Sequence, residues 1–392
     1  MTPPGAKPLR AVFLAHTAAP SGAELATLRL VSAMPAGRTA VVYTEDGPML
    51  RRMAERGIET RVVRNDFDSR AMTIDKAGVG SLLRGGLGLL RLGWRLGATM
   101  RELGATVLVA GSSKAMLMGA VAARRAGIPL VWHVHDRISA EYFGQWLATA
   151  VRLLGWLAVD GYIANSRGTL ASLYTWRRRA LVAYPGVEYR SVSEEPESGR
   201  REQRPAAETV VVVVGRLAPW KGQDLFLRAL ADVRNLPREV FLVGGTFFDE
   251  QDYRRELEVR ATALDLPVIF TGHVEDPEPY LHEADILVHC SVLPEPFGQV
   301  VVEGMRAGCA VIATRPGGPE EIVEPGVNGL LVDAGERARL THALDTLIAD
   351  QELRTKLAAA ARVRARDFDV AESARQVTEF LTTVPGKRWR HG

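Results

Sequence analysis

Residues 285–308 read Asp-Ile-Leu-Val-His-Cys-Ser-Val-Leu-Pro-Glu-Pro-Phe-Gly-Gln-Val-Val-Val-Glu-Gly-Met-Arg-Ala-Gly, and this stretch sets the fold that we expect. The apolar run that ends at Ser291 predicts a buried strand, and the residues that lead to Gly308 predict a helix. Pro294 and Pro296 fix the turn between the two elements. Strand, turn and helix in this order are the repeating unit of an α/β domain with a parallel sheet.

The start of this predicted helix has the features of a ligand site. Gly298 lets the backbone come close to a ligand, and the N–H groups of a helix start are unpaired donors that attract phosphate. Two carboxylates flank the turn: Glu295 precedes the helix, and Glu303 follows about two turns later at ~3.6 residues per turn. Acids beside an anion site make sense when the ligand also carries hydroxyls, as a sugar nucleotide does. A capped helix with solvated acids is the plainer alternative.

The same pattern of strand, glycine turn and helix recurs along the chain. Residues 9–15 precede a turn with Gly22, and residues 209–214 precede Gly215. A length of 392 residues also favours two domains of ~150–200 residues each. We therefore expect an α/β protein built from two Rossmann-like, doubly wound domains.

Composition sets the expected domain boundaries. The first Rossmann-like domain is expected to cover residues 1–188, and residues 189–207 form a charged linker with proline and glycine. The second domain is expected to cover residues 208–370. A terminal helix and a basic tail then occupy residues 371–392.

The overall composition excludes several classes of protein. A hydrophobic content of 47% and a charged content of 24% are those of a globular protein, and a net charge of +3 gives no support to a nucleic-acid partner. Cys290 and Cys309 lie in apolar segments, so we expect buried thiols in a reducing compartment. No signal-peptide pattern and no long uncharged apolar run occur, which predicts a cytoplasmic protein.

Two further strand ends carry side chains suited to chemistry. Arg216 and Lys221 follow the strand at 209–214, and paired cations suit a diphosphate because guanidinium bridges two oxygens while ammonium is a mobile point charge. His133 and His135 share one face of another strand, and His135 is nearer the carboxyl end, where open sheets place ligands. No third ligand occurs at metal-binding spacing, so we expect no metal site.

These motifs resemble those of the retaining glycosyltransferases of family 4. Glu295 and Glu303, with Pro-Phe-Gly between them, resemble the donor-site signature of that family. The Gly-Arg-x(4)-Lys-Gly element that ends in Lys221-Gly resembles the one that holds the leaving diphosphate. The resemblance runs from about residue 9 to residue 383 and is stronger in the second half. One departure is Ser21-Gly22, where family members usually carry two adjacent glycines.

The resemblance implies the GT-B fold, in which two Rossmann-like domains face each other across a deep cleft and the terminal helix folds back to the first domain. It implies transfer of a hexose or aminohexose from a UDP- or GDP-sugar to a hydroxyl of a glycan, lipid-linked or small-molecule acceptor. The configuration is retained and no metal or other cofactor is required. The implied catalytic residues are His135, Arg216, Lys221 and Glu295. The implied donor-binding residues are Gly22, Gly215, Gly244, His273, Val274, Pro296, Phe297, Gly298, Gln299, Val300 and Glu303.

Some alternatives stay open at this point. Sugar-nucleotide epimerases have the same fold. A non-catalytic module that binds nucleotide sugars is a second alternative, and it would be expected to lack some of the catalytic residues. Residues 80–104 are rich in Leu, Gly and Arg. They fit a surface helix packed on the sheet, which the glycines favour, or an amphipathic segment that holds the protein on the inner face of the membrane. The oligomeric state is also open.

Overall fold

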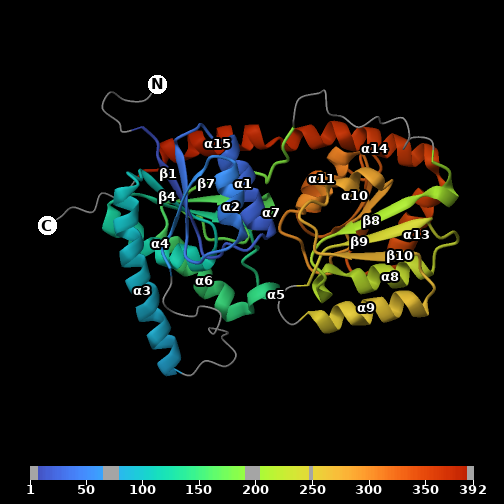
Figure 1. The fold of residues 1–392 in the computed structure, drawn as a ribbon, viewed down its shortest axis with the longest axis horizontal. Helices are drawn as coiled ribbons and strands as arrows, with labels where there is room; N and C mark the ends of the chain where they lie inside the picture. The colour runs from blue at the N-terminus through green and yellow to red at the C-terminus, as the bar shows by residue number, and fades with distance from the viewer. Residues whose placement is uncertain (1–7, 65–78, 190–203, 247–249, 386–392) are drawn as a thin grey trace. The chain divides into compact units, whose positions relative to one another are not determined.

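The computed structural model describes residues 8–64, 79–189, 204–246 and 250–385 of the chain. The chain divides into two compact units, each with its own sheet (Figure 1). The first unit runs to Gly186 and resumes at Val370, and the second unit is Val187–Asp369.

The first unit is built on a seven-stranded parallel sheet in the order β3-β2-β1-β4-β5-β6-β7. Its β-branched and apolar strands are buried on both faces, as parallel sheets require. The strand order reverses between β1 and β4, which makes the unit doubly wound as predicted. The strands are β1 Ala11–Ala15, β2 Thr39–Tyr43, β3 Glu59–Val62, β4 Val107–Ala110, β5 Leu130–Val134, β6 Gly161–Ala164 and β7 Arg179–Val182.

Helices cover both faces of this sheet, because successive strand residues point to opposite sides. Val12 and Leu14 of β1 join one core with α3, α4 and α6, whereas Ala11 and Phe13 join the other core with α1, α2 and α15. The helices are α1 Gly22–Ala33, α2 Pro48–Glu55, α3 Val79–Glu102, α4 Ser113–Ala126, α5 Ala140–Phe143, α6 Gln145–Ala158, α7 Arg167–Ala171 and α15 Val370–Thr383.

The terminal helix α15 belongs to the first unit although it follows the second in sequence. Val377 and Leu381 are buried in the same core as α1, and Figure 1 shows the red helix α15 beside the blue α1. Ser373 Oγ donates a hydrogen bond of 2.8 Å to the carbonyl oxygen of Tyr184. Burial of the apolar face of α15 therefore packs this C-terminal helix against α1 near the start of the chain.

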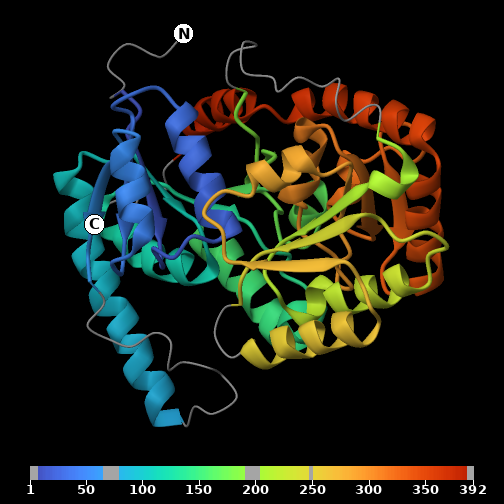
Figure 2. The ribbon, with the colours of Figure 1, turned by 45° about the vertical axis from the view of Figure 1, so that its right-hand side comes forward.

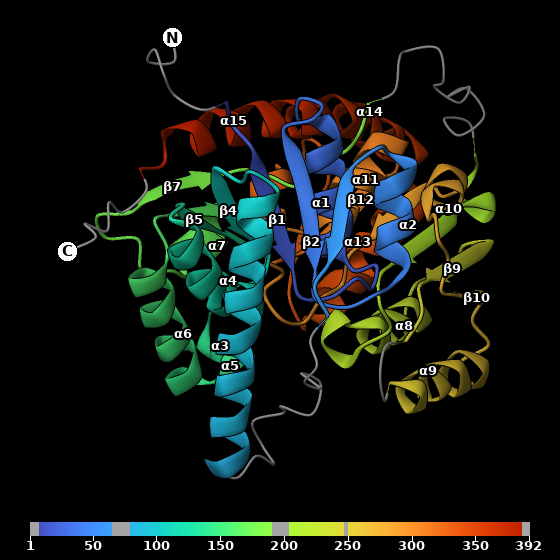
Figure 3. The same ribbon diagram turned by 60° about the vertical axis from the view of Figure 1, so that its left-hand side comes forward.

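Helix α3 shows how residues 80–104 pack as far as its side chains are described, from residue 88 onward. Leu92, Leu96 and Met100 are buried against the sheet and α4, as expected for a surface helix packed on the sheet. A Cβ atom on Gly93 would lie 2.7 Å from Cβ of Val121, closer than real contacts allow. The glycines therefore let α3 approach α4 closely (Figure 3).

The second unit is built on a six-stranded parallel sheet in the order β10-β9-β8-β11-β12-β13. The order again reverses, here between β8 and β11, and Figure 2 shows helices on both faces. The strands are β8 Val210–Val214, β9 Glu239–Val243, β10 Val268–Gly272, β11 Ile286–Val288, β12 Ala310–Arg315 and β13 Leu330–Asp333. The helices are α8 Gln223–Ala231, α9 Gln251–Ala263, α10 Glu278–Glu283, α11 Gln299–Ala307, α12 Pro319–Ile322, α13 Arg337–Ala349 and α14 Gln351–Ala365.

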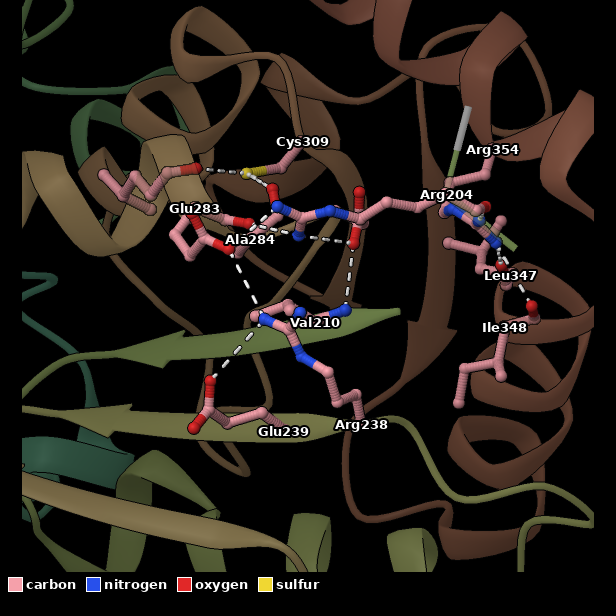
Figure 4. A network of polar contacts seen from close by, with 12 residues as sticks. Arg204, Val210, Arg238, Glu239, Glu283, Ala284, Cys309, Leu347, Ile348 and Arg354 are labelled. Atoms are coloured by element: carbon pink, nitrogen blue, oxygen red, sulfur yellow. Dashed lines mark hydrogen bonds and ion pairs between the residues drawn. The ribbon is translucent and has the colours of Figure 1, made fainter. Parts of the chain in front are cut away.

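Strand β11 is shorter than the predicted run from Asp285 to Ser291. Asp285 directly precedes the strand, and its carboxylate accepts hydrogen bonds from the backbone N–H of Val210, at 2.9 Å, and from Arg204, at 3.2 Å. The buried Arg354 donates to the carbonyl oxygen of Arg204 at 2.8 Å, and Figure 4 shows this network around the start of β8. These contacts fix the amino-terminal edge of the sheet, opposite the edge where a ligand is expected.

Candidate active site

In each unit the strand order reverses at one point, and open α/β sheets bind ligands outside the carboxyl ends of the strands at such a point. In the second unit the point lies between β8 and β11. Residues 215–222 leave the end of β8, and residues 289–298 leave the end of β11. The predicted residues Arg216, Lys221 and Glu295 therefore meet at one edge of one sheet.

Lys221 and Glu295 form an ion pair at this edge. Lys221 Nζ lies 2.7 Å from Glu295 Oε2, and their side chains are 19% and 13% exposed. Burial raises the pKa of the Glu295 carboxyl, but the charge of Lys221 and the contact with His289 outweigh it and hold that pKa well below its ordinary value. Glu295 is therefore a carboxylate at neutral pH.

A second layer of polar side chains, which sequence reasoning missed, orients Glu295. Ser291 Oγ donates to Glu295 Oε2 at 2.9 Å, and His289 Nε2 lies 3.4 Å from the same oxygen. The other ring nitrogen of His289 lies 3.2 Å from Oγ1 of Thr314, at the end of β12. The sequence shows His289 and Ser291 as polar residues at the end of an otherwise apolar run. It does not indicate that both contact the carboxylate of Glu295.

Close backbone contacts join the ends of β8 and β11. A Cβ atom on Gly222, whose φ is +74°, would lie 2.0 Å from the carbonyl oxygen of Cys290. The backbone N–H of Val292 donates to the carbonyl oxygen of Trp220 at 2.9 Å. The loop that carries Lys221 is therefore held against the loop that carries Glu295, and only glycine fits at the crossing.

Helix α11 begins at Gln299, next to Glu295. Gly298 precedes it with a left-handed φ of +93°, and Phe297 is buried. The backbone N–H of Gly318 donates to the carbonyl oxygen of Glu295 at 2.8 Å, which fixes the turn before the helix. Pro296 lies in this turn, and Val300 and Glu303 lie in the first turns of the helix. The first N–H groups of an α-helix have no partner within the helix.

Arg216 and Lys221 both lie near the ring of Trp220. Lys221 Nζ is 4.2 Å from the ring centroid of Trp220, and the Arg216 guanidinium is 5.9 Å from it. Arg216 also contacts Glu250 at 3.5 Å. Two cations are thus held at the end of β8, as predicted for a diphosphate site.

The remaining predicted residues of the second unit lie in neighbouring loops at the same edge. The backbone N–H of Gly215 donates to Val243 at 2.9 Å, and that of Gly244 donates to Gly272 at 3.1 Å. His273 is exposed directly after β10, and Val274 follows it half-buried. The loops after β8, β9 and β10 therefore form one packed rim.

Gly22 and His135 belong to the first unit. Gly22 begins α1 after β1, near the reversal point of that sheet, where His16 Nδ1 lies 2.9 Å from Oγ of Ser112. His135 is buried at the end of β5, and burial lowers its pKa from 6.5 to about 4. Its Nε2 has no hydrogen-bond partner among the described residues, so His135 offers a neutral imidazole nitrogen.

The chain matches two family models and is similar to solved structures. The model for glycosyl transferases group 1 matches residues 194–364, and the model for glycosyltransferase family 4 matches residues 48–191. Anabaena HepE, solved in complex with UDP and glucose, is 31% identical over 96% of this chain and 100% of its own, with a TM-score of 0.81.

The chain belongs to glycosyltransferase family 4. The predicted α/β fold of two Rossmann-like domains is confirmed, since the solved relative superimposes over nearly the whole chain. The lipopolysaccharide core biosynthesis glycosyltransferase LpsE of Rhizobium meliloti is 33% identical over 39% of this chain and 44% of its own length. A D-inositol 3-phosphate glycosyltransferase of Nocardioides is 28% identical over 67% of this chain and 64% of its own. The chain thus spans less than two thirds of these two relatives.

Two negative findings apply to the part of this family 4 chain that the structure describes. Among those residues, no three histidine, cysteine or acidic side chains gather closely enough to hold a metal ion. Within the same residues, no helix combines the length and apolar character needed to cross a membrane.

Proposed function

We propose that this family 4 glycosyltransferase transfers a hexose or aminohexose from a UDP-sugar to a hydroxyl of a saccharide-containing acceptor, with retention of configuration. Support for UDP over GDP comes from HepE, whose structures contain UDP, glucose and UDP-glucose. Support for a saccharide acceptor comes from relatives named for lipopolysaccharide core synthesis and for diphospho-undecaprenol-linked saccharides.

The observation that carries the proposal is the Lys221–Glu295 pair beside the start of α11. An ammonium group has three donors, so Lys221 can hold Glu295 with one and a phosphate oxygen with another. Lys221, His289 and Ser291 all contact Oε2 of the Glu295 carboxylate. We assign Oε1 to hydroxyls of the transferred sugar, which places the sugar next to the diphosphate.

The bond that breaks joins the anomeric carbon to the distal phosphate oxygen, and negative charge grows on UDP as it leaves. Arg216, Lys221 and the backbone donors at the start of α11 would stabilise that charge. The bond that forms joins the acceptor oxygen to the anomeric carbon on the same face. The acceptor proton passes to a departing phosphate oxygen, so no dedicated protein base is needed.

Two further residues have assigned roles in donor recognition. Glu303 would accept hydrogen bonds from the ribose, and His135 would meet the sugar. With a pKa lowered to about 4, His135 is neutral at working pH and can donate or accept at Nε2 without adding a charge near the developing oxocarbenium ion. The cations would act in place of a metal, and activity that survives EDTA tests that part of the proposal.

The test uses UDP-glucose, UDP-galactose, UDP-N-acetylglucosamine and GDP-mannose, each with a panel of saccharide and prenyl diphosphate-linked acceptors. We expect acceptor-dependent release of UDP and, by NMR, a product with the donor's anomeric configuration. Preference for GDP-mannose or an inverted product would contradict the proposal. Conversion of the donor without any acceptor would instead identify an epimerase.

A further inference from the structure

Helix α6 turns an apolar face to the solvent. Trp146 is 91% exposed and Leu157 is 50% exposed, and Leu153 and Leu154 lie exposed between them at helical spacing. The opposite face is buried through Ala148 and Gly155. A surface helix of a globular protein normally has the reverse pattern, with its polar residues outward.

Close packing fixes which face of α6 points outward. A Cβ atom on Gly155 would lie 2.6 Å from the ring of Trp132 on β5, so the helix sits as near the sheet as it can. Arg152, the one charged residue of the helix, donates at 2.8 Å to the carbonyl oxygen of Ile138. Figure 3 shows α6 along the outer side of α4, in agreement with their contacts.

A neighbouring loop extends this face. Trp176 is 65% exposed and stacks on Trp156 of α6, with ring centroids 6.2 Å apart. Trp156 Nε1 donates at 3.0 Å to the carbonyl oxygen of Trp176, which ties the loop to the helix. We call Trp146, Leu153, Leu154, Leu157, Tyr174 and Trp176 together the α6 surface.

Arginines outnumber acidic residues around the α6 surface. Residues 141–187 contain five arginines and two acids, Glu141 and Asp160. Asp160 accepts a hydrogen bond of 2.9 Å from the backbone N–H of Leu130, and Glu141 accepts one of 3.1 Å from Ser139 Oγ. Arg177 lies 4.5 Å above the ring of Trp176, and Arg178 lies 5.7 Å from that of Trp156. Cations therefore border the exposed aromatic rings.

We propose that the α6 surface docks the first unit on an anionic lipid bilayer. Tryptophan, tyrosine and leucine on one face with arginine at its border is the composition of helices that lie in the membrane interface. The arginines complement anionic headgroups, and the indole and phenol rings place apolar bodies in the acyl boundary with polar tips in water. This contact lies on α6 and the loop after α7, not on residues 80–104.

The test measures co-sedimentation of the full chain with vesicles of phosphatidylcholine alone or with added phosphatidylglycerol. We expect binding to the anionic vesicles, weakened by salt because the electrostatic part is screened. The double variant Trp146→Ser, Leu157→Gln should lower the partition coefficient about tenfold, equivalent to ~1.4 kcal/mol. Its melting temperature should match that of the wild type, since both side chains are exposed.

The matched control is Trp94→Ser, Leu90→Gln on α3, where the two side chains are 58% and 55% exposed. This control should bind vesicles like the wild type. If the double variant is unstable, the single change Trp146→Ser replaces it.

The proposal is overturned if the wild type does not bind anionic vesicles, or if the α3 control loses as much binding as the α6 variant. It is also overturned if the wild type is a dimer that Trp146→Ser makes monomeric. None of these readouts uses a donor sugar, so they stand apart from the proposed reaction.

Discussion

Among single residues, Lys221 and Glu295 act as one unit in the proposed reaction. Lys221→Met and Glu295→Gln should each lower kcat/KM by about 100-fold or more. The first removes a cation that would stabilise the leaving diphosphate, and the second removes the carboxylate that holds Lys221 and would hold the sugar hydroxyls. The double variant should lose little more than either single variant, since groups that act together are not additive. Steady-state kinetics with the preferred donor measures this.

The matched control for these variants is Lys356→Met, an exposed lysine of α14 in the same unit. It should keep wild-type kinetics. Independent, additive losses for Lys221 and Glu295 would contradict a shared role. Unchanged kcat/KM in either variant would remove that residue from the site.

His135 gives the first unit a predictable dependence on pH. Its pKa is about 4 when folded and near 6.5 when unfolded, so between these values the unfolded chain binds more protons. The free energy of unfolding should therefore fall as pH drops from 6.5 to 4, by on the order of 3 kcal/mol from this group. His133, also buried with a lowered pKa, acts in the same direction.

Calorimetry between pH 4 and 7 checks this on the wild type and on His135→Asn. The fall in the free energy of unfolding with decreasing pH should be smaller in the variant than in the wild type. An unchanged slope in His135→Asn would mean that His135 is not held neutral by burial.

At this scale the sequence predicted the residues of the motifs but not their supports. Arg216, Lys221 and Glu295 could be assigned because spacing and resemblance point to a diphosphate and a sugar. His289, Ser291 and Thr314 could not, because their role depends on one shared carboxylate that only the folded edge brings near.

At the scale of elements, the crossing between β8 and β11 requires glycine at 222. Gly222→Ala brings a Cβ atom within 2.0 Å of the carbonyl oxygen of Cys290, so backbone must move. Gly326 has nearly the same φ, +76° against +74°, but nothing within 4 Å of a Cβ atom. Gly326→Ala should cost only the roughly 1–2 kcal/mol of the left-handed backbone.

Denaturant unfolding and nucleotide titration measure the difference between the two glycine variants. Gly222→Ala should lose more stability than Gly326→Ala and should also lose nucleotide affinity, because it displaces the Lys221 loop. If both variants lose the same free energy of unfolding and keep their nucleotide affinity, Gly222 is not required for the contact with Cys290.

The element predictions failed mainly at the ends of elements. Strand β11 covers only Ile286–Val288 of the predicted run from Asp285 to Ser291, and the Asp285 carboxylate accepts hydrogen bonds from Val210 and Arg204. By local propensity, the glycines of residues 80–104 weaken an isolated helix. The structure uses Gly93 and Gly97 for close contact with α4, which local propensity does not report.

At the scale of the whole molecule, α15 makes the first unit depend on the end of the chain. Leu381→Ala should cost the first unit ~2–5 kcal/mol, because Leu381 is buried in its core. Hydrogen exchange should then speed up in β1 and β2 more than in β8. Glu379→Ala, an exposed change on the same helix, should leave exchange unaltered. Faster exchange confined to the second unit would contradict this assignment of α15.

The fold class was predictable at this scale because the alternation of apolar strands, glycine turns and helices is regular and long. That alternation predicts that the strand order reverses within each sheet, but not between which two strands. The order of the thirteen strands needed the structure, since nothing local in β11 specifies that it pairs with β8 and β12.

Calorimetric titration of the full chain with UDP, GDP, ADP and dTDP in the presence of EDTA tests the donor site at Lys221 and Glu295. We predict that UDP binds most tightly, and that Lys221→Met weakens UDP binding while Lys356→Met does not. Absence of binding by every nucleotide, or UDP binding that Lys221→Met leaves unchanged, would contradict a donor site at the Lys221–Glu295 edge.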